Sequence, residues 1–127
     1  MGLSILIVDD ATDVRRKLVE LVSCITGVTR VEQAPAAAEA WVSICNDAPD
    51  VVVLDIRMAG ISGIDLLRRI RAAGSRPLVV MLTNYSEAGY RQGCLDAGAN
   101  FFFDKSTEWE RAFEVLEQLA GTGRSEL

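Results

Sequence analysis

Five short apolar runs alternate along the chain with longer segments in which apolar residues recur every three or four positions. The runs occupy residues 4–8, 29–33, 51–54, 78–82 and 101–103. Short runs rich in β-branched and aromatic residues are typical of strands, and the periodicity between them is typical of amphipathic helices. Strands that alternate with helices pair in parallel through right-handed crossovers. The pattern therefore predicts an α/β domain built on a parallel sheet.

The helical segments differ in how many large apolar residues they carry. They are expected at about 12–25, 36–45 and 87–97, between Gly63 and Gly74, and after Thr107. The segment at 87–97 has few large apolar residues, and Gly89 and Gly93 lower its helix stability, so it is predicted to be the least firmly held helix. Thr107 and Glu110 have the spacing of a capping box, which predicts where the last helix begins.

The composition fits a single folded domain. A chain of 127 residues, 50% of them apolar and 24% charged, is long enough for one core and too apolar for disorder. We expect the domain to span residues 1–121 and residues 122–127 to form a short polar tail. The formal net charge of -5 disfavours direct contact with nucleic acid, because phosphate backbones attract clustered Lys and Arg.

Membrane segments, targeting signals and cysteine spacing indicate the compartment in which the protein is expected. No apolar run approaches the roughly 20 residues of a membrane span, and the first residues lack the features of a signal peptide. A cytoplasmic protein without membrane contact is expected. Cys24, Cys45 and Cys94 have no Cys-x-x-Cys spacing, so buried free thiols are expected. The absence of histidine excludes Ser-His and Cys-His nucleophile pairs and imidazole ligands.

Reactive side chains follow four of the five predicted strands. They are Asp9 and Asp10 after the first strand, Asp55 after the third, Thr83 after the fourth and Lys105 after the fifth. Because ligands bind beyond the carboxyl ends of the strands in an open parallel sheet, these side chains are expected to share one pocket. Three neighbouring carboxylates repel one another unless a cation lies among them, and hard oxygen ligands suit Mg²⁺. The sequence therefore predicts a magnesium site at this edge of the sheet.

The pattern resembles the receiver domain of two-component response regulators over essentially the whole chain. The residues that carry the resemblance are Asp9, Asp10, Asp55, Met58, Gly63, Thr83, Gly98, Ala99 and Lys105. The resemblance implies a flavodoxin-like fold, a doubly wound (βα)5 three-layer sandwich with the parallel strand order 2-1-3-4-5, for which a receiver protein is itself a standard example.

The resemblance also implies a chemical role for each site residue. Asp55 is the implied phosphoacceptor, which takes a phosphoryl group from a phosphohistidine of a separate sensor kinase. Mg²⁺ is implied to be held by Asp10, Asp55 and the backbone carbonyl of Arg57, with Asp9 acting through water. Lys105 is implied to pair with a phosphoryl oxygen.

Two further residues are implied to transmit the signal. The Thr83 hydroxyl would bond another phosphoryl oxygen, and the ring of Phe102 would rotate inward as Thr83 moves, changing the surface of the last two helices and the fifth strand. Implied partners are a sensor histidine kinase or phosphotransfer protein, a downstream protein or fused output domain, and a second copy bound through that surface. Such a domain is not classed as an enzyme, although it catalyses its own phosphorylation and dephosphorylation.

Several positions depart from the family pattern. Ser106 stands where the family usually has a proline joined by a cis bond, and a cis bond before another residue costs about 2.5–4 kcal/mol. The sequence leaves open whether the Lys105–Ser106 bond is cis or trans, and a trans bond would shift the turn and Lys105 with it. Ala59 replaces a frequent proline, which loosens its loop. Asn84 replaces a small residue and, with Arg57 and Tyr85, is expected to narrow access to the phosphoryl group and alter reaction rates.

Two other functions compete with the phosphorylation switch. A pseudo-receiver used only for protein association would not need the complete acidic set together with Lys105. A Mg²⁺-dependent phosphotransferase or phosphatase acting through an aspartyl phosphate would need an Asp-x-Asp nucleophile motif, which Asp9-Asp10-Ala11 does not supply. A stand-alone regulator and the receiver part of a longer DNA-binding regulator both fit the sequence.

Overall fold

The chain folds into five strands and five helices that alternate over the part that the structure, a computed structural model, describes, residues 2–58 and 60–122. The elements are β1 (Leu3–Val8), α1 (Thr12–Ser23), β2 (Val28–Ala34), α2 (Ala37–Asn46), β3 (Val51–Leu54), α3 (Gly63–Ala72), β4 (Leu78–Thr83), α4 (Ala88–Asp96), β5 (Phe101–Asp104) and α5 (Trp109–Thr122). The predicted strands are confirmed, each within one residue at either end.

The sheet has the order β2-β1-β3-β4-β5, and every neighbouring pair is parallel. This confirms the predicted flavodoxin-like fold. The register determines which residues meet at the carboxyl edge of the sheet. Val8 lies opposite Leu54, and Thr83 lies opposite Asp104. The residues that follow these strand ends are therefore brought to the same edge of the sheet.

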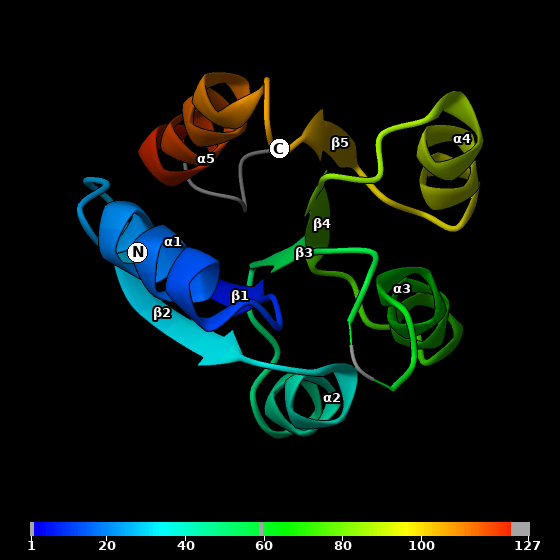
Figure 1. The fold of residues 1–127 in the computed structure, drawn as a ribbon. Helices are drawn as coiled ribbons and strands as arrows, with labels where there is room; N and C mark the ends of the chain where they lie inside the picture. Colours follow the sequence, from blue (N-terminus) through cyan, green and yellow to red (C-terminus); the bar gives the residue numbers. More distant parts are fainter. Residues whose placement is uncertain (1, 59, 123–127) are drawn as a thin grey trace.

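Helices cover both faces of the sheet, as expected for a three-layer sandwich. Figure 1 shows α1 and α5 on one face and α2, α3 and α4 on the other. Each face has its own buried cluster: Leu18, Val22, Leu116 and Leu119 pack on the first, and Ile44, Leu66, Leu67 and Ile70 on the second. The central strand β3 is buried on both faces, as its unbroken apolar run indicated.

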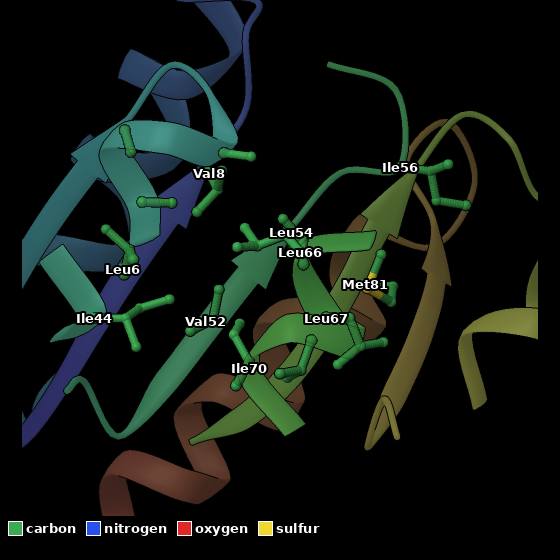
Figure 2. Packing of buried hydrophobic residues seen from close by; sticks show 14 of the residues in the cluster. Leu6, Val8, Ile44, Val52, Leu54, Ile56, Leu66, Leu67, Ile70 and Met81 are labelled. Carbon is green, nitrogen blue, oxygen red and sulfur yellow. The ribbon is translucent and has the colours of Figure 1, made fainter. Parts of the chain in front are cut away.

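The core beneath α2 and α3 fixes the strands that lead to the site. In Figure 2, side chains of β1, β3 and β4 meet side chains of α2 and α3. The labelled residues are Leu6, Val8, Ile44, Val52, Leu54, Ile56, Leu66, Leu67, Ile70 and Met81. Burying one such side chain stabilises the fold by about 1.5–3 kcal/mol. The strand ends that carry the reactive residues therefore rest on a rigid base.

The last helix begins differently from the prediction. A capping box would join Thr107 to Glu110, whereas the structure starts α5 at Trp109. The Glu108 carbonyl accepts from the Ala112 N–H at 3.1 Å, so Glu108, one residue after Thr107, is the N-cap residue. The Glu108 side chain also accepts from the Asp104 N–H at 2.9 Å.

The C-terminal boundary also shifts slightly. Helix α5 continues to Thr122, one residue beyond the expected end of the domain, and the rest of the predicted polar tail lies outside the described residues. Ala59 and its expected effect on the loop also lie outside them. None of the described helices combines the length and apolarity that crossing a membrane requires.

The three cysteines do not share one environment. Cys94 is buried in α4, but Cys24 and Cys45 are exposed, so the expectation of three buried thiols was wrong for two of them. Cys45 follows Ile44 on α2, and one helical step of about 100° carries it off the inward face. Cys24 lies just beyond the last residue of α1.

The difference in burial predicts a difference in thiol reactivity. Burial raises the pKa of the Cys94 thiol to about 11, which keeps it in the unreactive protonated form. In the native protein we expect a thiol-specific reagent to label Cys24 and Cys45 rapidly, and Cys94 only after denaturation. Peptide mapping by mass spectrometry identifies the labelled sites. Equal labelling rates at all three sites would contradict the described burial.

Candidate functional site

The carboxyl ends of β1, β3 and β5 bring three charged side chains together in a buried position. Asp9, Asp55 and Lys105 are 2%, 8% and 7% exposed. The Lys105 Nζ donates to Asp9 Oδ2 at 2.6 Å and to Asp55 Oδ2 at 2.7 Å. The sequence predicted that these residues would meet, and the structure confirms it.

The Lys105 ammonium is held in its charged form by these contacts. Burial by itself lowers the pKa of a lysine, but the hydrogen bonds from Asp55 and Asp9 and their negative charges act more strongly, so the pKa of Lys105 is raised above 10.5. Short charge-assisted bonds of this kind are stronger than neutral ones. The ammonium therefore offsets the repulsion between two buried carboxylates.

The remaining carboxylate oxygens are also bonded, which fixes the orientation of both acids. Asp9 Oδ1 accepts from the Ala11 N–H at 2.9 Å, and Asp55 Oδ1 accepts from the Ile56 N–H at 2.7 Å. Arg15 donates to the backbone carbonyl of Asp9 at 2.9 Å. Both acids are thus positioned by groups of their own strand ends and of α1.

A cleft of about 480 Å³ opens over this cluster. Its lining residues come from four strand ends and α1: Asp9, Asp10, Ala11, Val14, Asp55, Arg57, Met58, Asn84, Tyr85 and Lys105. Asp10 is exposed, so it faces solvent more than the other two acids do. Asp55 lines this cleft although it is only 8% exposed.

The three acids do not form the compact cluster that the sequence predicted. Among the described residues, no group of three His, Cys, Asp or Glu side chains is arranged to hold a metal ion. The reason is visible in the geometry: Asp9 and Asp55 both bond to Lys105, while Asp10 is directed to the surface. The donor chemistry nevertheless fits Mg²⁺, because three carboxylates line a single cleft.

Thr83 also lies differently from the expectation of one shared pocket. Its side chain is fully buried, and its Oγ1 accepts from the Tyr85 N–H at 3.2 Å, so it does not line the cleft. Asn84 and Tyr85 line it instead. The guanidinium of Arg57 lies 4.7 Å from the centre of the Tyr85 ring, a cation–π contact between two loops of the cleft. The grouping of Arg57, Asn84 and Tyr85 at the cleft is as predicted.

Gly63 is required where α3 approaches the loop after β3. A Cβ atom at this position would lie 1.9 Å from the backbone carbonyl oxygen of Asp55, closer than any real contact. The Gly63 N–H donates to the Ile56 carbonyl at 2.7 Å, and Ser62 caps the helix by accepting from the Asp65 N–H. The glycine therefore lets α3 support the backbone that carries Asp55.

Comparison with known proteins decides the family. The family profile of the response regulator receiver domain matches residues 5–117. The chain belongs to the response regulator receiver family. Receiver domains are the signal-accepting domains of two-component systems, and they are signalling proteins rather than members of an enzyme class.

Individual proteins and solved structures similar to this receiver domain support the same family. The response regulator MprA of Mycobacterium ulcerans is 36% identical over 119 residues, which cover 94% of this chain and 50% of that protein. The solved N-terminal domain of an uncharacterized Wolinella succinogenes protein is 32% identical, with a TM-score of 0.86 and full coverage of both chains. A chain of the CheX-CheY-BeF3-Mg²⁺ complex of Borrelia burgdorferi has a TM-score of 0.74 at 26% identity, covering 89% of this chain and 88% of that one. This receiver domain spans about half the length of the curated relatives it matches.

Phe102 of this receiver domain is on the inside of the fold. Its side chain is 4% exposed and belongs to the core beneath α3 and α4. The Arg91 guanidinium of α4 lies 4.8 Å from the ring centre, and Arg91 also pairs with Glu108 at 3.5 Å. One arginine thus links α4 to β5 and to the start of α5. This link strengthens a helix that the sequence predicts to be weakly held.

The turn after Lys105 contains a polar cluster that the sequence reading missed. Asp104 Oδ1 accepts from the Ser106 N–H at 2.8 Å and from its hydroxyl at 2.6 Å, while Oδ2 accepts from the Ser86 hydroxyl. The described residues contain no cis peptide bond, so the Lys105–Ser106 bond, which the sequence left open, is trans. An Asp whose side chain bonds the N–H two residues on is a known turn pattern, and that spacing was the available signal.

Ser106→Ala is expected to raise the pKa of Asp104. The Ser106 hydroxyl is the largest cause, and the Ser86 hydroxyl the second, of a pKa lowered from 3.8 to about 2. Carbon-detected NMR titration of the Asp104 carboxyl should show its pKa rise toward 3.8 in Ser106→Ala, and by less in Ser86→Ala. An unchanged pKa in both variants would show that the described hydrogen bonds do not form in solution.

Proposed function

We propose that this receiver domain is a phosphorylation-dependent switch in which Asp55 accepts a phosphoryl group. The observation that carries the proposal is the position of Asp55: a carboxylate at the edge of an open cleft, 2.7 Å from a lysine ammonium and next to a second buried acid. A carboxylate in this position can act as a nucleophile. The Lys105 ammonium beside it can stabilise the negative charge of an incoming phosphoryl group.

The proposed step is transfer of a phosphoryl group from a phosphohistidine to a carboxylate oxygen of Asp55. The new bond joins that oxygen to phosphorus as the phosphorus–nitrogen bond to the imidazole breaks, and the released imidazole takes a proton from solvent. Lys105 exchanges its bond to Asp55 for a bond to a phosphoryl oxygen. These 127 residues contain no histidine, so the phosphohistidine lies outside them, in this proposal on a sensor kinase or phosphotransfer protein.

The proposed cofactor is Mg²⁺, as is general for receiver domains. Asp10, Asp55 and the backbone carbonyl of Arg57 would hold it, with Asp9 acting through water. Bound there, the cation neutralises negative charge where an anionic phosphoryl group meets a carboxylate. The supporting observations are the three carboxylates that line one cleft and the Mg²⁺ named in the Borrelia burgdorferi complex.

The proposed response couples Thr83 and Phe102. To donate to a phosphoryl oxygen, the Thr83 hydroxyl, which accepts from the Tyr85 N–H, would turn toward the cleft and draw the loop after β4 with it. The Phe102 ring, packed beside β4, would adjust with it. The surface of α4, β5 and α5 would then present a changed face to a downstream protein, to a fused output domain or to a second copy.

Incubation with acetyl phosphate tests the proposal directly. We expect the intact mass to increase by one phosphoryl group in the presence of Mg²⁺, with chelation by EDTA preventing the increase. Reduction with borohydride followed by peptide mapping should locate the modification at Asp55. An unmodified chain under these conditions would favour the pseudo-receiver role, and an adduct on another residue would refute the assignment of Asp55.

A further inference from the structure

Asp104 connects the two loops that flank the phosphorylation site. Its Oδ1 bonds to Ser106 within the turn that follows β5, and its Oδ2 bonds to Ser86 in the loop that follows β4. The register places Asp104 opposite Thr83, so one side chain spans the gap between the strand that ends in Thr83 and the strand that precedes Lys105.

A backbone bond reinforces this connection at the lysine itself. The Lys105 N–H donates to the Thr83 carbonyl at 2.7 Å. The direction in which the lysine side chain leaves the backbone therefore depends on the conformation of the turn after β5. The ammonium donates to Asp9 and Asp55, which follow the strands β1 and β3. A small rotation of the turn after β5 would therefore lengthen both bonds.

Ser106 makes the turn dependent on Asp104. Proline fixes its own φ by its ring, whereas serine has no such restraint and adopts several backbone conformations. Here the restraint is the pair of bonds from the Ser106 N–H and hydroxyl to one oxygen of Asp104. The pKa of Asp104, lowered mainly by the Ser106 and Ser86 hydroxyls, is consistent with a carboxylate that stays ionised at neutral pH.

We propose that Asp104 is a positioning residue for phosphoryl transfer: through Ser106 and Ser86 it holds the Lys105 turn against the loop after Thr83, so that the ammonium stays beside Asp55. The inference rests on the proposed function. Asp104 itself does not touch the reacting atoms. Its role is to fix the separation between the lysine and the threonine that would bind the same phosphoryl group.

Three variants separate this role from a general effect on stability. Asp104→Ala removes both connections, while Asp104→Asn keeps an acceptor for Ser106 and a donor for the Ser86 hydroxyl. Asp96→Ala is the matched control, because the carboxylate of Asp96 is exposed and accepts from the side-chain amide of Gln92 on the same helix, away from Asp104. We expect Asp104→Ala to slow adduct formation from acetyl phosphate by about tenfold to a hundredfold, the range for a displacement of up to 1 Å. Asp104→Asn and Asp96→Ala should stay within about threefold of wild type.

A second readout observes the lysine without any phosphorylation. The chain has two lysines, Lys17 and Lys105, so selective ¹³C labelling of lysine gives two signals, with exposed Lys17 as an internal control. In Asp104→Ala the Lys105 signal should move toward that of Lys17, because the ammonium leaves Asp9 and Asp55, while it should keep its wild-type position in Asp104→Asn. If Asp104→Ala does not fold, the double variant Ser86→Ala/Ser106→Ala keeps the carboxylate and should show both effects at a smaller size, because the backbone N–H of residue 106 still donates to Asp104 Oδ1.

The outcomes are distinguishable. A folded Asp104→Ala variant with a wild-type rate and a wild-type Lys105 signal overturns the inference, as does a variant whose melting temperature alone changes. A wild-type chain that acquires no phosphoryl group refutes the proposed function, whereas the lysine signal still reports whether Asp104 positions Lys105.

Discussion

Asp55→Asn is expected to abolish the phosphoryl adduct while leaving the domain folded. The asparagine amide oxygen can still accept the Ile56 N–H that Asp55 accepts at 2.7 Å, and Lys105 keeps its bond to Asp9. The amide is nearly the same size as the carboxylate, so the core beneath it does not change. It lacks the anionic oxygen that would attack phosphorus in the proposed transfer, so intact mass after incubation with acetyl phosphate and Mg²⁺ should show no increase.

The control for this variant is the same chemical change elsewhere. Asp65 is exposed in the first turn of α3, and Asp65→Asn should gain the phosphoryl group at the wild-type rate. Thermal unfolding of Asp55→Asn should remain a single cooperative transition. An adduct on Asp55→Asn at wild-type yield would mean that another residue is the acceptor.

The strands were the most predictable part of the fold. The run that forms β3, Val51–Leu54, is buried on both faces, so its apolar residues need no alternation and mark the strand without ambiguity. Strand order did not follow from the apolar pattern and came from the family resemblance. Helix ends were less predictable: the first helical bond of α5 is accepted by the Glu108 carbonyl, one residue after the Thr107 that the capping-box spacing indicated.

The composition of the site was predictable, but its connections were not. Residues after parallel strands reach the same sheet edge, which is why Asp9, Asp55 and Lys105 were found from sequence. The hydrogen-bond partners of these side chains depend on their rotamers and on residues distant in sequence. Lys105 and Asp9, for example, are 96 residues apart. For the same reason the sequence did not indicate that Thr83 bonds to the Tyr85 N–H instead of facing the cleft.

Lys105→Met should destabilise the fold more than most single substitutions. Methionine fills a similar volume but leaves Asp9 and Asp55, both nearly inaccessible to solvent, without their shared cation. Removing one partner of a buried ion pair costs about 3–5 kcal/mol, because the remaining charge stays buried. Urea denaturation at neutral pH should therefore show a loss of that size in the free energy of unfolding.

Lys17→Met is the matched control, since Lys17 is exposed on α1, and its effect should stay within about 0.5 kcal/mol. Adding Asp9→Asn to Lys105→Met should recover part of the loss, because one unpaired carboxylate is removed. Equal losses in the single and double variants would point to packing rather than charge.

The same ion pair determines how stability responds to alkaline pH. The pKa of Lys105 is raised above 10.5 in the folded state, so its contribution is fully present below pH 10.5 and is lost as the pH rises through the folded-state pKa. Wild type should therefore lose stability in that alkaline range, and Lys105→Met should lack this component. If both proteins lost stability equally above pH 10.5, Lys105 could not be the group that responds. The buried lysine would then not be the cation that holds the two acids together.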